Sequence, residues 1–464
     1  MQSRLAQRLE QYRNLQRISL AMPGHKGGRG IPDELRKHFF SYDVTELSDT
    51  DSLYESEGAL KEAQERAARF YQSRETLFLV NGSTSGIFIM LLSCCHAGDR
   101  VLVSRHCHQS VIHACTVFGL VPVYLESTLI PGFEIPDGIS PAAVEHALKE
   151  EKVSAVLITS PNYYGVASDV AAISEIVHRY GIPLLADEAH GAHFAASEKI
   201  FPKSAVRQGA DMVVQSAHKT LAAMNQTAFL HICSDRVDKE RVHTAAKMLQ
   251  TSSPSYAMLA TADEAREALE ENGAEEWGRV LKACETARKL LSEVVTLPKF
   301  RKEFYDPCRL VIPVMEYDLT GFSLAERLRC EDRIDVEMAD TGCVVLLPSP
   351  FNSTEEIVSA ANAVVRILKT VSKKEKHSNA LPPIPETVLS PREAFEKSGI
   401  WMDWEQAIGR ISKNTVVIYP PGTPVIVLGE RISRESISAI QRAEHDGAEV
   451  TGIRKNQFYV VEES

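Results

Sequence analysis

The residues that could most readily take part in a chemical reaction lie at the ends of apolar segments. Lys219 follows the segment 212–217, and Asp187 closes the apolar part of the segment 183–189. A lysine at the end of a buried strand can lose its proton and attack carbonyl groups as an amine. An aspartate at the tip of such a strand is costly to bury unless a positive group faces it. The two side chains predict a buried site that combines an amine nucleophile with a carboxylate.

Small hydroxyl residues form a third group in the segment 81–86, which reads Asn-Gly-Ser-Thr-Ser-Gly. At the start of a helix, such residues offer backbone N–H groups, the helix dipole and hydroxyls to a phosphate. The same residues are common turn formers and helix caps, so this segment alone does not identify a site. Together with Lys219 and Asp187 it matches the needs of pyridoxal 5′-phosphate (PLP). These needs are a Schiff-base lysine, a carboxylate for the pyridine nitrogen and a phosphate cradle.

The elements that must position these residues alternate between short apolar strands and helices. Strands are expected at 76–80, 101–105, 121–127, 154–160, 183–189, 212–217 and 227–232. Helices between most of them predict an α/β fold with a mostly parallel sheet flanked by helices. Ligands of such sheets bind beyond the carboxyl ends of the strands, so the candidate residues are expected on one rim.

Changes in pattern divide the 464 residues further. A long polar helix is expected from the 260s to the early 290s, with a break near Asn272-Gly273. A charge run followed by prolines predicts a linker. The predicted parts are an N-terminal arm and loop at 1–30, a large PLP-binding domain at 31–260, a small α+β domain at 261–372, a linker at 373–385 and a C-terminal domain at 386–464.

Composition excludes several classes of protein. A net charge of -11 without a basic block argues against a nucleic-acid partner. No apolar run approaches the roughly 20 residues of a membrane span. The polar N-terminus lacks the apolar core of a signal peptide, so a cytoplasmic location is expected. Nine cysteines without a CxxC pair indicate reduced thiols and no metal site.

The sequence closely resembles the Orn/Lys/Arg decarboxylases of PLP fold type I, the aspartate-aminotransferase-like fold. The resemblance implies the short form of that family, without an extra N-terminal response-regulator-like domain, and with a C-terminal α/β extension after the small domain. It spans nearly the whole chain and is carried by MPGHKGG (22–28), DVTEL (43–47), FLVNGST (78–84), TSPNYYG (159–165), DEAHGAHF (187–194), VVQSAHKTL (213–221) and YPPGTPVIVLGE (419–430).

The resemblance implies roles for residues at matching positions. Lys219 forms the Schiff base, Asp187 holds the pyridine nitrogen, and the imidazole of His108 stacks on the cofactor ring. His218 contacts phosphate or donates a proton. The implied catalytic residues are Lys219, His218 and His108. The implied cofactor-binding residues are Ser83, Thr84, Ser85, His108, Asp187, Ala189, His190, Ser216, His218 and Lys219.

The implied reaction is decarboxylation of a basic L-amino acid, namely arginine, lysine or ornithine, to an amine that serves polyamine biosynthesis. A distal ammonium or guanidinium group needs an acidic partner. The candidates are Glu430, Glu337 and Glu55, with Glu430 preferred because the segment before it matches the family. Sites of fold type I are usually completed by a second subunit, which implies a homodimer or a larger homo-oligomer.

Departures from the family pattern leave two alternatives open. The segment 51–58 lacks the usual His and Pro, and His106 stands where Asn is usual. One alternative is another PLP reaction on an amino acid, such as transamination, oxidation or elimination, with a keto acid, ammonia or peroxide as product. The other is a non-catalytic regulator, against which the retention of both Lys219 and Asp187 argues.

Overall fold

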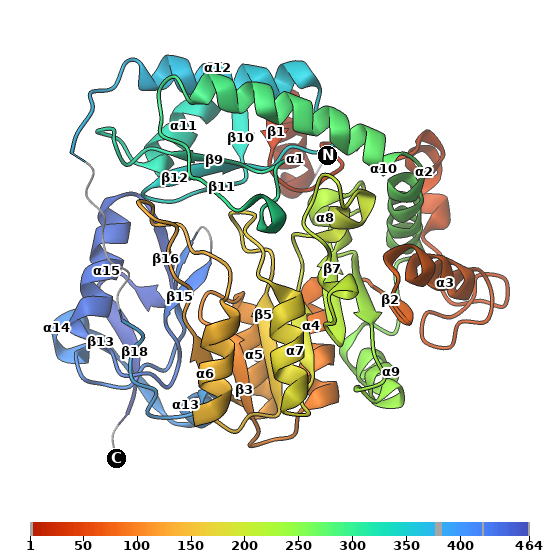
Figure 1. Ribbon diagram of the computed structural model, residues 1–464, viewed down its shortest axis with the longest axis horizontal. Helices are drawn as coiled ribbons and strands as arrows, with labels where there is room; N and C mark the ends of the chain where they lie inside the picture. Colours follow the sequence, from red (N-terminus) through yellow and green to blue (C-terminus); the bar gives the residue numbers. More distant parts are fainter. Residues whose placement is uncertain (1–2, 376–382, 420–421, 463–464) are drawn as a thin grey trace.

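The computed structural model describes residues 3–375, 383–419 and 422–462 (Figure 1). Its centre is a seven-stranded sheet in the order β2-β8-β7-β6-β5-β3-β4. The strands run parallel except β8, which is antiparallel to both of its neighbours. The predicted mostly parallel sheet is therefore confirmed. Its strands are β2 (Glu75–Leu79), β3 (Arg100–Ser104), β4 (Val121–Leu125), β5 (Ala155–Thr159), β6 (Leu184–Asp187), β7 (Met212–Ser216) and β8 (Ala228–Ile232).

Helices cover both faces of this sheet because alternate strand residues point to opposite sides. In β3, Val101 and Val103 pack with the helices of one face, while Leu102 packs with those of the other. The first face carries α4 (Gly82–Cys94), α5 (Gln109–Phe118) and α9 (Lys239–Leu249). The second carries α3 (Ala59–Tyr71), α6 (Pro141–Glu150), α7 (Val170–Arg179) and α10 (Tyr256–Leu291). The shorter helical segments are α2 (Asp33–His38), η1 (Phe39–Tyr42), η2 (Ala192–Ala196), η3 (Ala205–Arg207) and α8 (Ala217–Thr220).

Helix α10 runs without interruption for 36 residues, so the break predicted near Asn272-Gly273 is wrong. Gly273 is buried at the point where α10 crosses η2. A Cβ at this position would lie 3.1 Å from the Cβ of Ala196 and 3.0 Å from Cδ1 of Leu269. The glycine thus serves close packing, which outweighs its helix propensity penalty of about 1 kcal/mol.

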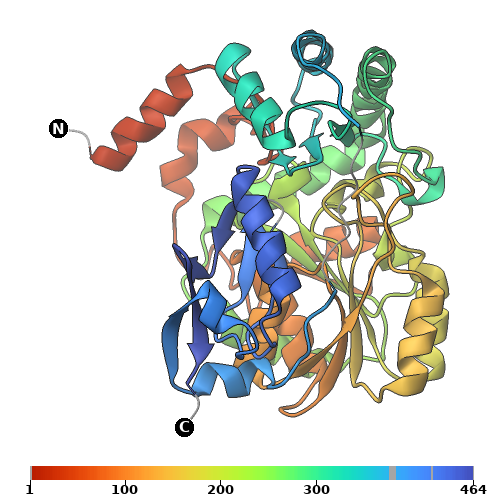
Figure 2. The ribbon, with the colours of Figure 1, turned by 90° about the vertical axis from the view of Figure 1, so that its left-hand side faces the viewer.

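A smaller sheet in the order β11-β12-β9 lies beside the large one. Figure 1 shows α10 and α12 running side by side above it. The N-terminal arm also joins this region, because β1 pairs in parallel with β10. Figure 2 shows α1 at the edge of the molecule. The bounds are α1 (Arg4–Asn14), β1 (Ile18–Leu20), η4 (Lys302–Phe304), β9 (Leu310–Pro313), α11 (Gly321–Glu331), β10 (Ile334–Val336), β11 (Met338–Ala339), β12 (Cys343–Leu346) and α12 (Thr354–Leu368).

The C-terminal part forms two three-stranded sheets, β13-β18-β17 and β15-β14-β16. It packs on the large sheet region through α13, which contacts α5. Residues 376–382 of the predicted linker and residues 420–421 of the segment 419–430 lie outside the described residues. Its elements are α13 (Pro391–Glu396), β13 (Gly399–Asp403), α14 (Trp404–Ala407), β14 (Val416–Tyr419), β15 (Thr423–Ile426), α15 (Arg434–His445), β16 (Glu449–Thr451), β17 (Ile453–Arg454) and β18 (Gln457–Val461).

The domain boundaries after residues 30, 260, 372 and 385 stay a prediction. Among the residues that the structure describes, none of the helices combines the length and apolar character of a membrane span.

Candidate active site

One pocket opens at the carboxyl ends of β5, β6 and β7, as expected for a parallel sheet. Thr159 and Asp187 end β5 and β6 as paired residues, and Lys219 lies in α8 directly after β7. The start of α4 closes the opposite side. Of the predicted site residues, those that line the pocket are Ser83, Thr84, His108, Asp187, Ala189, His190, His218 and Lys219.

The amine of Lys219 is enclosed, although part of its side chain faces the pocket. Its Nζ lies 3.0 Å from Nε2 of His190 and 5.7 Å from the ring centroid of Tyr163. Burial lowers the pKa of Lys219, and the positive charge of Arg309 adds to this effect, while Asp187 and Glu337 oppose it. A lysine with a lowered pKa holds a larger fraction of uncharged amine, which is the form that attacks carbonyl groups.

The carboxyl group of Asp187 is almost fully buried at the tip of β6. One of its oxygens accepts a hydrogen bond of 3.1 Å from the backbone N–H of Ala189. Burial raises the pKa of Asp187, and the nearby Lys219 amine opposes this rise. A buried carboxylate of this kind favours a cationic partner such as a protonated pyridine nitrogen.

The first turn of α4 has features that suit a bound anion. Gly82 begins the helix with φ of +72°, and no acidic residue lies in the first turn. The hydroxyls of Ser83 and Ser216 lie 2.8 Å apart, so the ends of two elements meet there. Ser85 is buried and donates to the carbonyl oxygen of Gly82 instead of lining the pocket. Free N–H groups and hydroxyls at a helix N-terminus suit a phosphate, so these residues fit the phosphate group of PLP.

His108 and His218 flank the pocket as uncharged rings. His108 caps α5, where its Nδ1 accepts a hydrogen bond of 3.2 Å from the backbone N–H of Ser110. His218 donates from Nδ1 to the carbonyl oxygen of Thr227 at 2.9 Å. Burial lowers the pKa of each imidazole to about 4. Both side chains are therefore held in place and neutral at physiological pH.

Two pocket neighbours carry no role in the sequence-based prediction. Tyr163 lines the pocket and packs its ring against His190 at 4.8 Å between centroids. Arg309 is fully buried and donates to the carbonyl oxygen of Tyr163 at 2.9 Å. The one signal for Arg309 in the sequence is a charged residue directly before the apolar run 310–313.

The three acidic candidates for substrate binding fall in very different places. Glu430 is buried, and both of its oxygens accept from the guanidinium of Arg105, the Nη2–Oε2 distance being 2.9 Å. A buried ion pair thus occupies the carboxylate of Glu430 and argues against a contact with the substrate, and the role of Glu430 as substrate partner stays a prediction. Glu55 lies outside the pocket with 74% of its side chain exposed and pairs with Lys247. The role of Glu55 as substrate partner also stays a prediction.

Glu337 is the acidic candidate whose charge acts on the reactive lysine. Its negative charge opposes the lowering of the Lys219 pKa by burial. One carboxylate oxygen accepts from the backbone N–H of Met22 at 2.7 Å. The side chain is thus held beside the site by the N-terminal arm.

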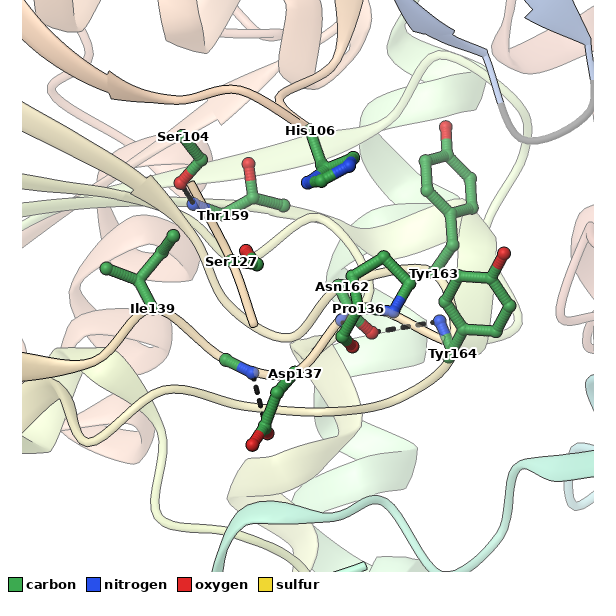
Figure 3. A pocket seen from close by; sticks show the side chains of 11 residues that line it. Ser104, His106, Ser127, Pro136, Asp137, Ile139, Thr159, Asn162, Tyr163 and Tyr164 are labelled. Carbon is green, nitrogen blue, oxygen red and sulfur yellow. Dashed lines mark hydrogen bonds between the residues drawn. The ribbon is translucent and has the colours of Figure 1, made fainter. Parts of the chain in front are cut away.

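A second, smaller cavity shares Thr159 and Tyr163 with the pocket that contains Lys219 (Figure 3). His106 and Thr159 border it on one side, and Asp137 and Asn162 on the other. Burial, together with the charge of Arg105, lowers the pKa of His106 to about 4. The departure from the family pattern at His106 therefore places a neutral imidazole beside the pocket that contains Lys219.

A phosphate cradle, a buried carboxylate and an enclosed lysine on the rim of such a sheet define the PLP-dependent enzymes of fold type I. Comparison with known families takes this further. The family model described as "Orn/Lys/Arg decarboxylase, major domain" matches residues 4–308. The model described as "Orn/Lys/Arg decarboxylase, C-terminal domain" matches residues 374–452. The chain belongs to the Orn/Lys/Arg decarboxylase family and is an amino acid decarboxylase. The predicted family, fold class and enzyme class are confirmed.

Relatives and solved structures agree with this assignment. The chain is 30% identical to an arginine decarboxylase of Bacillus subtilis over 98% of this chain and 96% of the relative. It is 31% identical to an arginine decarboxylase of Bacillus anthracis, over 94% and 92% of the two chains. The fold is similar to that of the Francisella novicida lysine decarboxylase LdcF, with a TM-score of 0.76, 20% identity and coverage of 95% and 78%.

Proposed function

We propose that this decarboxylase binds PLP at Lys219 and that arginine is its substrate. The observation that carries the proposal is that Lys219 and the buried carboxylate of Asp187 line the same pocket. Two relatives that match almost the whole chain are named arginine decarboxylase, which supports arginine before lysine or ornithine.

Each residue of the pocket has a distinct task in this reaction. When bound, PLP supplies an electron sink for the pair left behind by the departing carboxyl group. Asp187 would hold the protonated ring nitrogen, His108 would stack on the ring, and the phosphate would lie at Ser83, Thr84 and Ser216. His218 is uncharged at neutral pH because burial lowers its pKa to about 4, and its single ring hydrogen is donated from Nδ1 to the carbonyl oxygen of Thr227. We therefore assign the return of a proton to the substrate to Lys219.

The products formed from three separate substrates test this function. Protein loaded with PLP is incubated with arginine, lysine or ornithine, and mass spectrometry detects agmatine, cadaverine or putrescine. We expect agmatine from arginine as the dominant amine, and none from a Lys219→Ala variant. A different dominant amine would reassign the substrate. No amine from any of the three, with PLP bound, would contradict decarboxylation and direct the search to keto acids, ammonia or peroxide.

Glu337 is the acidic residue that we assign to the distal positive group of the substrate. We expect Glu337→Gln to raise KM for the preferred substrate about 10- to 100-fold, the scale of one charge-assisted hydrogen bond. The kcat value should change less, because the contact is made before and during the reaction alike. Steady-state kinetics measure both values. Glu396→Gln is the matched control, since Glu396 lies on the surface with 56% of its side chain exposed. An equal rise in KM in both variants would remove this assignment.

We also propose that the protein acts as a homodimer or larger homo-oligomer, in the cytoplasm, in polyamine formation. Exposed apolar side chains on α1 support a partner subunit, with Leu5 70%, Leu9 60% and Tyr12 49% exposed. The chemistry of the products supports the metabolic role, because decarboxylated basic amino acids are polyamines or their precursors.

A further inference from the structure

A chain of buried polar side chains leads from α10 to the reactive lysine. His193 Nε2 lies 3.1 Å from Asp306 Oδ2, and the same oxygen lies 3.7 Å from Nε of Arg309. Arg309 Nη1 lies 3.4 Å from Nδ1 of His190, whose Nε2 lies 3.0 Å from the amine of Lys219. The four residues behind Lys219 are at most 3% exposed.

His193 forms the end of this series of side chains that lies farthest from Lys219, and packing holds it in place. His193 packs its ring 4.5 Å from the ring of Trp277 in α10. Burial alone would raise the pKa of Asp306, but His193 and Arg309 bring it below its usual value. Asp306 is therefore ionised, and it balances the charge of the buried guanidinium. This ion pair and the hydrogen bond to the carbonyl oxygen of Tyr163 place Arg309 next to His190.

Hydrogen-bond chemistry decides the protonation state of His190. A guanidinium donates hydrogen bonds and has no lone pair to accept one, so Nδ1 of His190 must accept from Arg309. Burial, reinforced by Lys219 and Arg309, lowers the pKa of His190 well below its usual value, so the ring is neutral. A neutral imidazole carries one hydrogen, which then resides on Nε2 and faces Lys219. The amine can take part in this contact only through a free lone pair.

We propose that Arg309 is a positioning residue that acts through His190, holding the imidazole in the tautomer that donates to Lys219 and so keeps the amine unprotonated until PLP binds. The proposal rests on the function assigned above to Lys219. It explains why the segment 187–194 carries two histidines, since His193 secures Asp306 and His190 contacts the lysine. The charged and titratable groups that act on Lys219 or are perturbed by it are Asp187, Glu337, Arg309, His108, His190 and His218.

The rival explanation is that Arg309 acts on Lys219 by its own charge, without His190. A double-mutant cycle separates the two, because residues that act in series give non-additive effects. The full chain, freed of cofactor, is mixed with PLP over a range of pH, and the adduct at Lys219 is fixed with borohydride and quantified by mass spectrometry. The midpoint pH of adduct formation reports the fraction of unprotonated amine.

We expect Arg309→Met to raise this midpoint by about one pH unit, the scale of one lost interaction. In a His190→Gln background the same change should cause a clearly smaller shift, namely the part that the charge of Arg309 contributes directly. Arg279→Met is the control, because Arg279 donates a hydrogen bond to the carbonyl oxygen of Asn352 and has no assigned role at the site. An unchanged midpoint in Arg309→Met, or shifts that add in full, would overturn the inference.

A measurement on the unmodified sequence covers the case in which Arg309→Met fails to fold. Nitrogen-15 NMR of histidine-labelled protein distinguishes the two imidazole tautomers. We expect the hydrogen of His190 on Nε2; a hydrogen on Nδ1 would overturn the inference. The proposed function fails in a different way, namely if the unmodified chain forms no adduct at Lys219 at any pH.

Discussion

Replacing Lys219 by alanine is expected to reduce amine production to below about a thousandth of that of the unmodified enzyme, within the range for loss of a group that transfers protons. The variant loses both the covalent anchor for PLP and the proton donor that we assign to the reaction. Amine yield by mass spectrometry and the mass of the borohydride-fixed protein measure the two losses separately. Lys247→Ala is the control, because Lys247 lies on the surface and pairs with Glu55.

A second buried lysine makes this experiment informative. Burial lowers the pKa of Lys26 to about 7, which would make its amine a rival nucleophile. Its Nζ donates to the carbonyl oxygens of Ala21 and Leu347, the latter at 2.9 Å. These hydrogen bonds occupy the amine and stabilise the fold. Adduct formation at Lys26 in the unmodified protein, or persistent activity of Lys219→Ala, would contradict the assignment of Lys219.

The second large effect concerns stability. We expect Glu430→Gln to lower the free energy of unfolding by about 3–5 kcal/mol, because it leaves the buried guanidinium of Arg105 without its counter-charge. Arg105 also stacks on Tyr124 at 4.6 Å and donates to the carbonyl oxygen of Val425, so it remains buried when its partner changes. Urea unfolding followed by circular dichroism gives the free energy.

Glu55→Gln serves as the control for this measurement and should change stability by less than about 0.5 kcal/mol, as exposed ion pairs contribute little. The two roles considered for Glu430 predict opposite results. A structural ion pair predicts lost stability with KM nearly unchanged in the protein that remains folded. A raised KM with unchanged stability would restore Glu430 as a substrate ligand.

The sheet and the rim of the site could be predicted because both depend on local sequence. Runs of apolar residues separated by helices determine a parallel sheet, and the side chain after each strand falls at the same edge. Lys219, Asp187 and the segment 81–86 were found in this way, and the structure brings them to one pocket.

What escaped prediction depends on contacts between distant parts of the chain. Arg105 and Glu430 are 325 residues apart, so a matched motif could suggest importance for Glu430 but not an ion pair. Gly273 was interpreted from its weak helix propensity, whereas its packing against Ala196 determines the outcome. Arg309 carries no local motif, and its contact with His190 spans 119 residues.

The N-terminal arm has a consequence for how the enzyme is made. Met22 donates to Glu337, 315 residues later, and Gly24 donates to the carbonyl oxygen of His218 at 2.8 Å. A ribosome adding about 5–20 residues per second needs on the order of fifteen to sixty seconds to cover such a distance. The arm therefore leaves the ribosome long before its partners exist. The last steps of site formation wait until the strands of the small sheet have been translated, and the nascent chain holds no complete active site before then.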